Sequence, residues 1–587
     1  MTKKVALLAF LVFWLFTGLS GVHAQSFRSA ASGDLLYGDF DNDLDPIYIW
    51  ENQGYRAYTI LSNLSSWNDR FIANSNNGIY LFGISGSFGL PQFGDWRSRT
   101  MFLIQLADSR GDANSGLDTD FDGVVDIGGE GYMSGDLVQY FDINDDNIFD
   151  TRANYSATAD NYDILKRRDW NVVHSYGRGE TSLGFKFSHL GFGNNYSESN
   201  RHADLFEVVT PAHTYSYSNM LSQTDLSNLT VLERRREKGE FLTTYATPSN
   251  IFQVALDMPF DMLTDSDIRF DIALELPEDN YLVNDRFDYF RDVSSGAAVD
   301  INEISESVNV DSSLGGYFVR PMVRLTKHWS PRTYSWFDLA FGTGKFDADK
   351  SFADIYAAQR QLTNPGGNVM VITNGYEETI GQTGDTGRKF IGFYHKTVAA
   401  LTEKFTFSAG LRFGYLSDKT DWDADYMTVL SGAYDDGNQV SDHADSSYTQ
   451  TSAMAANLIA TTKTTTIDLP VAMEYALGRW TFRLGAIHQI ARQIDREDFV
   501  VTESAPMVTT IIYGDGDTTI TVEDNEYLSQ GSARETQDSN TNFVYGLELK
   551  ANEHLKVELL GFMDTANVDV LNTNFYRQLR MSLTVLF

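Results

Sequence analysis

The chain closes on Phe575-Tyr-Arg-Gln-Leu-Arg-Met-Ser-Leu-Thr-Val-Leu-Phe587, a stretch in which apolar and polar residues alternate to the last position. Because successive side chains of a strand point to opposite faces, this alternation gives one wholly apolar face and one polar face. The apolar face consists of Leu579, Met581, Leu583, Val585 and Phe587. A soluble sheet seldom ends on such a bare apolar face, so we expect lipid to cover it.

This terminal segment resembles the closing strand and C-terminal sorting signal of Gram-negative outer-membrane β-barrel proteins, porin-like but of no specific subfamily. The resemblance implies a location in the cell outer membrane of a Gram-negative bacterium, in contact with outer-membrane lipid and lipopolysaccharide. The oligomeric state stays open, with a trimer as one option.

The start of the chain agrees with export. Lys3 and Lys4 precede an apolar run over residues 5–16, and small residues then lead to Ala24. This order predicts a signal peptide over residues 1–24 that is removed after export. No later stretch offers about 18 consecutive apolar residues, so membrane-spanning helices are excluded.

Composition excludes several classes of site. The chain has no cysteine, which rules out disulfides, thiol nucleophiles and cysteine-ligated metals. The formal net charge of −35 argues against a nucleic-acid partner, which requires a basic surface. The same charge concentrates cations near the protein.

The rest of the chain is dominated by period-two alternation, which predicts antiparallel hairpins. Hairpins with short turns are expected at 78–107, 170–190, 251–276, 315–343, 389–417, 466–491 and 542–565. With the terminal strand and one strand near 55–64, they make an all-β transmembrane barrel of about 16 strands, in a range of roughly 14 to 18. We expect residues 25–54 to form an extended periplasmic segment and residues 55–587 to form the barrel.

The predicted connections alternate between short and long. Short turns are expected at 260–266, 327–331, 401–404, 478–479 and 551–554, and long polar stretches at 108–169, 191–250, 277–314, 344–388, 418–465 and 492–541. Transmembrane barrels have short periplasmic turns and longer extracellular loops. The long acidic stretches are therefore predicted to be extracellular loops.

Charged side chains on the polar faces of the strands are expected to line the lumen, because an arginine facing lipid at the midplane costs roughly 2–4 kcal/mol. The candidate pore-lining residues are Arg320, Arg324, Arg412 and Arg483, opposed by Asp271 and Glu474. They are expected to form either a charged constriction that selects solutes or a lattice of ion pairs that stiffens the wall.

The stretch 108–169 carries two acidic runs with the alternating carboxylates of calcium loops. The candidate ligands are Asp118, Asp120, Asp122 and Asp126 in the first run, and Asp142, Asn144, Asp146 and Asp150 in the second. Both runs resemble EF-hand-like or thrombospondin-type calcium repeats. Gly129 and Ala153 stand where those loops carry a bidentate glutamate, so the alternatives are weak calcium binding and a solvated acidic loop.

The leading functional hypothesis is a channel that passes small hydrophilic solutes through a charged lumen. The alternatives are a calcium-stabilised surface barrel with a structural or partner-binding role, and a barrel for uptake of hydrophobic compounds. A TonB-dependent receptor is disfavoured, because no plug-sized globular domain is expected before the first strand. We expect no enzymatic activity: His443 lies near Ser441 and Asp445, but HExxH, GxSxG and phosphate-loop motifs are absent.

Overall fold

The structure of the chain is a computed structural model. The structure describes residues 27–62, 80–87, 95–112, 114–117, 127–141, 148–149, 151–211, 215–216, 229–295, 298–364, 366–524, 529–563 and 580–587. The signal peptide predicted over 1–24 lies outside these residues.

Within the described residues, sixteen antiparallel strands pair in sequence order and the last pairs with the first, so the sheet closes into a ring. The ring contains β1 (Arg56–Ser62), β2 (Tyr80–Gly86), β3 (Arg97–Asp112), β7 (Thr151–Arg178), β8 (Thr181–Pro211), β10 (Leu229–Pro259), β11 (Ser266–Ser295), β12 (Ala298–Ser330), β13 (Thr333–Thr363), β14 (Val369–Ala400), β15 (Phe405–Asp435), β16 (Ser446–Leu477), β17 (Trp480–Ser504), β20 (Gln530–Lys550), β21 (Leu555–Met563) and β22 (Arg580–Leu586). The terminal strand closes the ring against β1, with Leu583 opposite Thr59. The all-β antiparallel barrel and its strand number are as the sequence predicts.

Six further strands of the described part of the chain lie outside the ring. Strands β4 (Asn114–Leu117) and β5 (Ile127–Phe141) pair with each other, and β5 also pairs with β7. Strands β18 (Met507–Tyr513) and β19 (Thr518–Glu523) extend the sheet from β16. The short strands β6 (Ile148–Phe149) and β9 (Tyr215–Ser216) form a separate pair.

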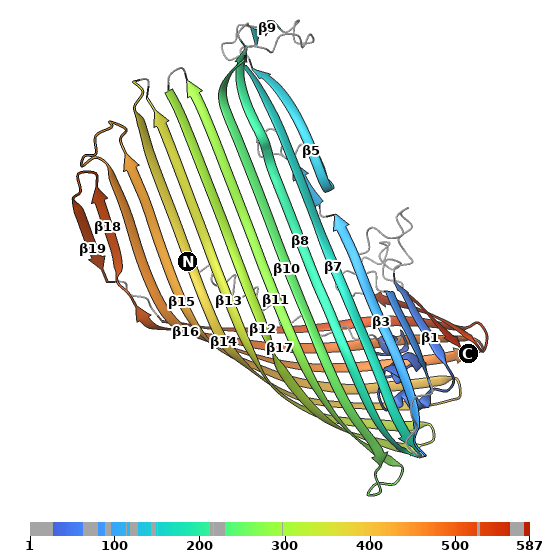
Figure 1. Ribbon diagram of the computed structural model, residues 1–587. Coiled ribbons are helices and arrows are strands. Elements are labelled where there is room, and N and C mark those ends of the chain that lie inside the picture. The colour runs from blue at the N-terminus through green and yellow to red at the C-terminus, as the bar shows by residue number, and fades with distance from the viewer. Residues whose placement is uncertain are drawn as a thin grey trace.

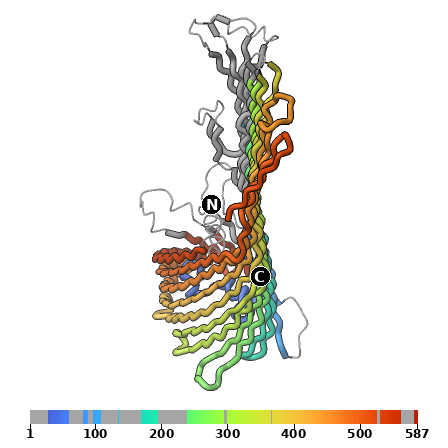
Figure 2. Tube along the Cα trace, turned by 90° about the vertical axis from the view of Figure 1, so that its left-hand side faces the viewer, coloured from blue at the N-terminus to red at the C-terminus, as the bar shows by residue number. Residues whose placement is uncertain are grey.

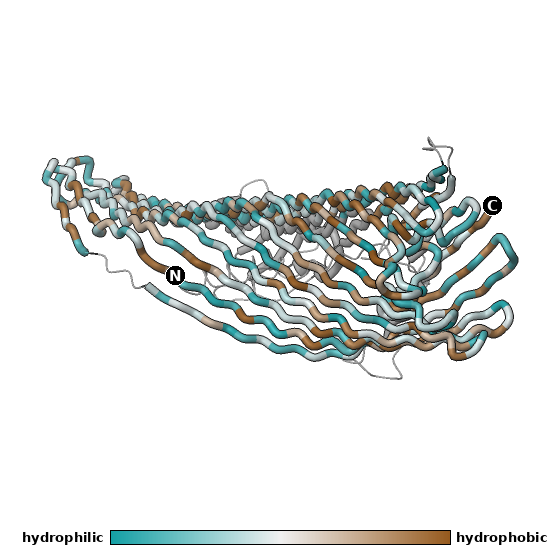
Figure 3. Tube along the Cα trace, turned by 90° about the horizontal axis from the view of Figure 1, so that it is seen from below, coloured by the Kyte–Doolittle hydropathy of each residue, from teal (hydrophilic) through white to brown (hydrophobic). Residues whose placement is uncertain are grey.

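The polarity of the two faces of β13 inverts along the strand. On the outward face, Leu339 and Phe341 are 44% and 49% exposed, as expected for side chains that contact lipid. Further along the same face, Lys345 and Asp347 are exposed and charged. The membrane boundary therefore lies between Phe341 and Lys345, which leaves a membrane-crossing segment of about ten residues, the length that a tilted strand needs. Apolar and polar residues also alternate along the neighbouring strands (Figure 3).

Beyond this boundary the strands do not end in loops. Strand β13 has 31 residues, and the part after Phe341 continues for roughly 70 Å at the usual rise of about 3.3 Å per residue. Figure 2 shows these strands rising from one side of the barrel as a tall wall. We call this wall the extension, which includes residues 299–317, 344–363, 369–388, 418–435 and 446–464. The prediction that the long polar stretches are loops is wrong here, because polar residues on the exposed face hide the strand period.

The inner face of the extension has its own small apolar core. Ile380, Tyr426 and Met454 are buried on three neighbouring strands, and Tyr426 makes an edge-on contact with Phe499 at 6.0 Å between ring centroids. The buried members of this core are Ile380, Ala424, Tyr426, Met454 and Ala456. The inner face of the extension thus buries apolar side chains together with Lys350, Asp354 and Glu378, while its outer face carries exposed charges such as Lys345 and Asp347.

The segment before β1 lies inside the ring (Figure 1). It contains α2 (Phe27–Ser32), α3 (Asp39–Leu44) and the 3-10 turn η1 (Tyr48–Glu51). Its side chains contact inward-facing residues of most ring strands, from Tyr58 on β1 to Lys556 on β21. We call residues 27–53 the plug. This position differs from the extended periplasmic segment expected for residues 25–54. In the part of the chain that the structure describes, no helix is long and apolar enough to cross a membrane.

Candidate functional site

The plug is folded by its own acidic residues. The carboxylate of Asp41 accepts a hydrogen bond from the Gly38 backbone N–H at 2.7 Å, which caps the start of α3. The carboxylate of Asp45 accepts the backbone N–H groups of Ile47 and Tyr48 at 2.8 and 3.1 Å, which holds the turn that follows. Carboxylates at helix starts are stabilising, because they satisfy free N–H groups there. The two α-helices have six residues each, too few to be stable alone, so they depend on the barrel wall.

One contact between plug and wall joins Asp45 to Arg269 on β11. Nη1 of Arg269 donates to both carboxylate oxygens of Asp45, at 2.8 and 2.9 Å. The other edge of the same guanidinium donates to Asp271, at 2.6 and 3.0 Å. Arg269 is only 2% exposed, so these charge-assisted hydrogen bonds are shielded from water.

A second contact buries Asp43 completely. Its carboxylate accepts hydrogen bonds from Tyr58 on β1 at 2.6 Å and from Ser85 on β2. Asn52 of the plug donates to it at 2.8 Å, and Arg99 on β3 lies 3.7 Å away. The ion pair with Arg99 and the hydrogen bonds from Tyr58 and Ser85 tie the plug to the first three strands of the ring.

Aromatic rings of the plug cover a cationic part of the wall. Tyr48 stacks on Trp336 of β13 with 5.2 Å between centroids, and Tyr37 meets the same indole edge-on at 5.1 Å. Nζ of Lys396 on β14 lies 3.3 Å from the Trp336 ring centroid and 4.1 Å from the Tyr37 ring centroid. Arg324 lies over Trp336 on the same side of the plug, 4.2 Å from the ring centroid. These cation–π contacts place two positive charges directly against the plug.

Three further ion pairs complete the contact around the ring. Asp34 pairs with Arg412 on β15 at 3.1 Å, and Asp39 pairs with Lys556 on β21 at 3.2 Å. In the opposite sense, Arg28 of the plug pairs with a wall carboxylate, Glu474 on β16, at 2.8 Å.

Two glycines of the wall make room for the plug backbone. A Cβ at Gly184 on β8 would collide with the carbonyl oxygen of Pro46, and one at Gly485 on β17 would collide with that of Ala31. Any larger residue at either position would push the plug away from the wall, so these glycines are part of the docking surface.

The structure places five of the six candidate pore-lining residues in the plug contact or directly behind it. Arg324 pairs with Asp338 at 2.7 Å, and Arg483 pairs with Glu474 at 2.8 Å. Arg483 also pairs with Glu548 and, at 2.9 Å, with Glu558. Arg412 and Asp271 flank the plug as described above. Arg320 is exposed on the inward face of β12, and within the described residues it makes no ion pair.

The plug carboxylates were missed as site residues because the run from Asp39 to Asp45 reads as an acidic, extended stretch. Phe40 and Leu44 stand four residues apart and are both buried, at 6% and 7% exposure. This spacing is that of one helix face, and it was the available signal for a docked helix.

The eight candidate calcium ligands lie outside the described residues. The histidine considered for an enzymatic site, His443, lies at the exposed tip of the extension. Its ring stacks on Tyr513 at 3.9 Å between centroids, and its Nδ1 lies 3.0 Å from the Asp515 carboxylate. The backbone N–H of Asp517, followed by His443 itself, lowers the pKa of Asp515 below its usual value.

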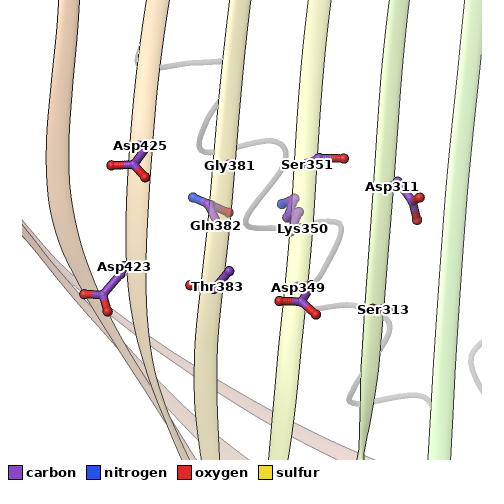
Figure 4. A pocket seen from close by; sticks show the side chains of 10 residues that line it. All are labelled: Asp311, Ser313, Asp349, Lys350, Ser351, Gly381, Gln382, Thr383, Asp423 and Asp425. Atoms are coloured by element: carbon purple, nitrogen blue, oxygen red, sulfur yellow. The ribbon is translucent and has the colours of Figure 1, made fainter.

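A shallow hollow of about 330 Å³ opens on the outward face of the extension (Figure 4). Its four carboxylates belong to Asp311, Asp349, Asp423 and Asp425, on three strands of the sheet. Figure 4 shows these side chains spread over the sheet rather than pointing to one centre. The hollow therefore belongs to the charged outer surface of the extension.

No family model matches the chain, and no curated protein matches it. Among solved structures, similarity is found to FpvA from P. aeruginosa bound to heterologous pyoverdines, with 8% identity, a TM-score of 0.23 and coverage of 91% of this chain and 71% of that one. The alcaligin outer membrane receptor FauA from Bordetella pertussis has 9% identity, a TM-score of 0.22 and coverage of 91% and 76%. The outer membrane transporter YddB from Escherichia coli has 8% identity, a TM-score of 0.23 and coverage of 91% and 81%. TM-scores this low do not establish a shared fold.

The class of the protein follows from its own strand pairing and surface. The ring is closed, and its outward face carries exposed apolar side chains such as Ile272, Leu339 and Leu484 at the level where the inward face is charged. Closed barrels are the only sheets that satisfy all backbone groups in lipid. The chain is a transmembrane β-barrel protein.

Proposed function

We propose that this protein is a gated outer-membrane transporter, in which small hydrophilic solutes pass through the charged lumen when the plug is displaced. The observation that carries the proposal is the plug itself, which contacts opposite sides of the ring through Arg269 on β11 and Lys556 on β21. A passive channel needs an open lumen, whereas these contacts close part of it. The proposal therefore keeps the charged lumen of the sequence hypothesis and replaces free passage by gating.

The chemistry of the contacts suits reversible opening. The plug is held by ion pairs, hydrogen bonds and ring contacts, and the absence of cysteine rules out a disulfide link. Its short helices lose their support when the wall contacts break, so the detached plug is expected to unfold as a flexible segment. A flexible segment can leave a lumen that a rigid domain of the same size cannot.

Single-channel conductance in planar bilayers tests this proposal. The wild-type protein is expected to be mostly closed, and the combined variant Asp34→Asn, Asp39→Asn and Asp45→Asn is expected to open. A matched control removes the same charge from the outer face of the extension, with Asp347→Asn, Asp349→Asn and Asp385→Asn, and is expected to stay closed. A wild-type channel as open as the plug variant would refute gating by the plug.

A surface role is the second candidate, favoured by the extension. The strands continue far beyond the membrane boundary at Phe341, and transport across the membrane does not require that length. Removing residues 346–386 from the β13–β14 hairpin separates the two roles. If the extension serves only the surface, the shortened protein keeps the conductance and gating of the wild type; a changed conductance would make the extension part of the transport path.

A further inference from the structure

We infer that the opened lumen binds anionic solutes and that the acidic plug occupies their place in the closed state. This inference rests on the proposed function and names the substrate class of the same site. The chemistry required of the solute is one or more carboxylate or phosphate groups, small enough to pass between the wall residues that now hold the plug.

The plug has the charge of such a solute. Between Asp34 and Glu51 it carries six acidic residues and no lysine or arginine. Four of these carboxylates pair with cations of the wall: Asp34 with Arg412, Asp39 with Lys556, Asp43 with Arg99 and Asp45 with Arg269. The wall therefore already binds carboxylates at several positions around the ring.

The wall has buried cations whose hydrogen-bonding capacity is not used by the plug. Lys396 is 0% exposed, its Nζ has no hydrogen-bond partner within the described residues, and it lies over the rings of Tyr37 and Trp336. Arg56 and Arg99, at 8% and 4% exposure, each have two guanidinium nitrogens without a hydrogen-bond partner among those same residues. Buried donors are rarely left unsatisfied, because each costs free energy. An anion in the lumen would satisfy them.

Displacement of the plug changes the charge balance of the lumen in one direction. Arg269, Arg412 and Lys556 each lose a carboxylate of the plug. On the acidic side, Glu474 loses Arg28 but keeps Arg483 at 2.8 Å. Each of these three cations keeps one wall carboxylate, Asp271, Asp468 and Glu558 respectively. Loss of the plug nevertheless removes three carboxylates from wall cations and only one cation from a wall carboxylate. The lumen therefore becomes more positive than in the closed state, which favours anionic solutes.

The test measures ion selectivity of the opened channel in a potassium chloride gradient. The combined variant Asp34→Asn, Asp39→Asn and Asp45→Asn is the open form, and a protein lacking residues 27–53 is the second open form in case the first does not assemble. We expect the reversal potential to shift toward the chloride equilibrium potential in either open form. On this background, Lys396→Met with Arg99→Gln is expected to reduce the shift, whereas Lys345→Gln on the outer surface leaves it unchanged.

The outcomes separate the two proposals. An open channel that prefers potassium, or that has no preference, overturns the anionic substrate class and leaves gating intact. A channel that stays closed in both forms overturns gating. Inorganic phosphate and acetate, added separately at millimolar concentration, then distinguish the solute: block by phosphate alone assigns phosphate-bearing solutes, and block by both assigns carboxylates as well. Block by neither compound overturns the inference.

Discussion

Asp45 and Arg269 lie 224 residues apart in sequence, and their side chains meet in the lumen through two hydrogen bonds of 2.8 and 2.9 Å. Because Arg269 belongs to the wall and Asp45 to the plug, one substitution at Asp45 is expected to weaken closure of the lumen. The same arginine keeps Asp271 when Asp45 is removed, so the wall itself should tolerate the change.

The first prediction concerns Asp45→Asn. A charge-assisted hydrogen bond contributes about 1.5–3 kcal/mol, and each ~1.4 kcal/mol is a factor of ten, so the plug should open about 10- to 100-fold more often. Because the natural chain has no cysteine, a single Ala31→Cys substitution reports opening through its reaction with a thiol reagent. Ala31 is fully buried, so labelling requires displacement of the plug. The three proteins compared are Ala31→Cys alone, Ala31→Cys with Asp45→Asn, and Ala31→Cys with Asp347→Asn as the matched control. Equal labelling rates in all three would show that the Asp45–Arg269 pair does not hold the plug.

The second prediction tests the membrane boundary on β13. Leu339→Arg places a charge in the lipid belt and should destabilise the folded barrel by about 2–4 kcal/mol. Ser351→Arg lies on the same outward face of the same strand but in the extension, where water surrounds it. Denaturant unfolding in lipid vesicles, followed by tryptophan fluorescence, measures both. An equal loss of unfolding free energy in the two variants would show that the membrane boundary does not lie between Phe341 and Lys345.

The third prediction concerns Arg483, which is buried among Glu474, Glu548 and Glu558. Arg483→Met removes the buried cation that these three carboxylates share, and breaking a buried pair typically costs about 3–5 kcal/mol. The control is Arg492→Met, whose partner Glu535 is exposed, and there we expect no measurable loss. The two proteins are compared by the same unfolding assay, and a stable Arg483→Met barrel would show that the wall does not depend on this ion-pair lattice.

The fourth prediction concerns calcium. The first acidic run has the pattern of a calcium loop, with Asp118, Asp120, Asp122 and Asp126 as its candidate ligands. Because it has no glutamate at the twelfth position, we expect a dissociation constant for calcium of about 10⁻⁴ to 10⁻³ M. Isothermal titration of the wild type against Asp120→Asn with Asp122→Asn measures it, and Asp146→Asn is the separate test of the second run. If calcium gives no binding heat with the wild-type protein, both runs are solvated acidic stretches without a calcium site.

The strands of the membrane region could be predicted from the sequence because lipid imposes a strict pattern on them. Phe337, Leu339 and Phe341 must be apolar, while Asp338 between them faces the lumen, and this contrast is visible in the letters alone. In the extension, water contacts the outward face of β13. Lys345 and Asp347 therefore lie on the same face of the strand as the lipid-facing Leu339 and Phe341. Polar residues then occupy the outward positions that are apolar in the membrane region, and in the sequence this part of the strand resembles a polar loop.

The plug could not be predicted for a different reason. Its position depends on pairs such as Asp43 with Tyr58 and Asp39 with Lys556, which join distant parts of the chain. A carboxylate in a sequence does not show whether it faces water or a buried arginine. The candidate pore-lining arginines were found because strand alternation places them inward, while their partners in the plug were visible only once the ring had closed.

The most direct test of plug gating is a reversible lock between plug and wall. A Cβ built on Gly546 lies 3.1 Å from the Cβ of Ala31, close to the separation of about 3.5–4.5 Å in disulfides. Ala31→Cys and Gly546→Cys are introduced into the open variant with Asp34→Asn, Asp39→Asn and Asp45→Asn, and Ala31→Cys alone serves as the control. We predict a closed channel after oxidation and an open channel after reduction, only in the paired variant. The same open conductance before and after reduction, with the disulfide shown to have formed, would contradict the account.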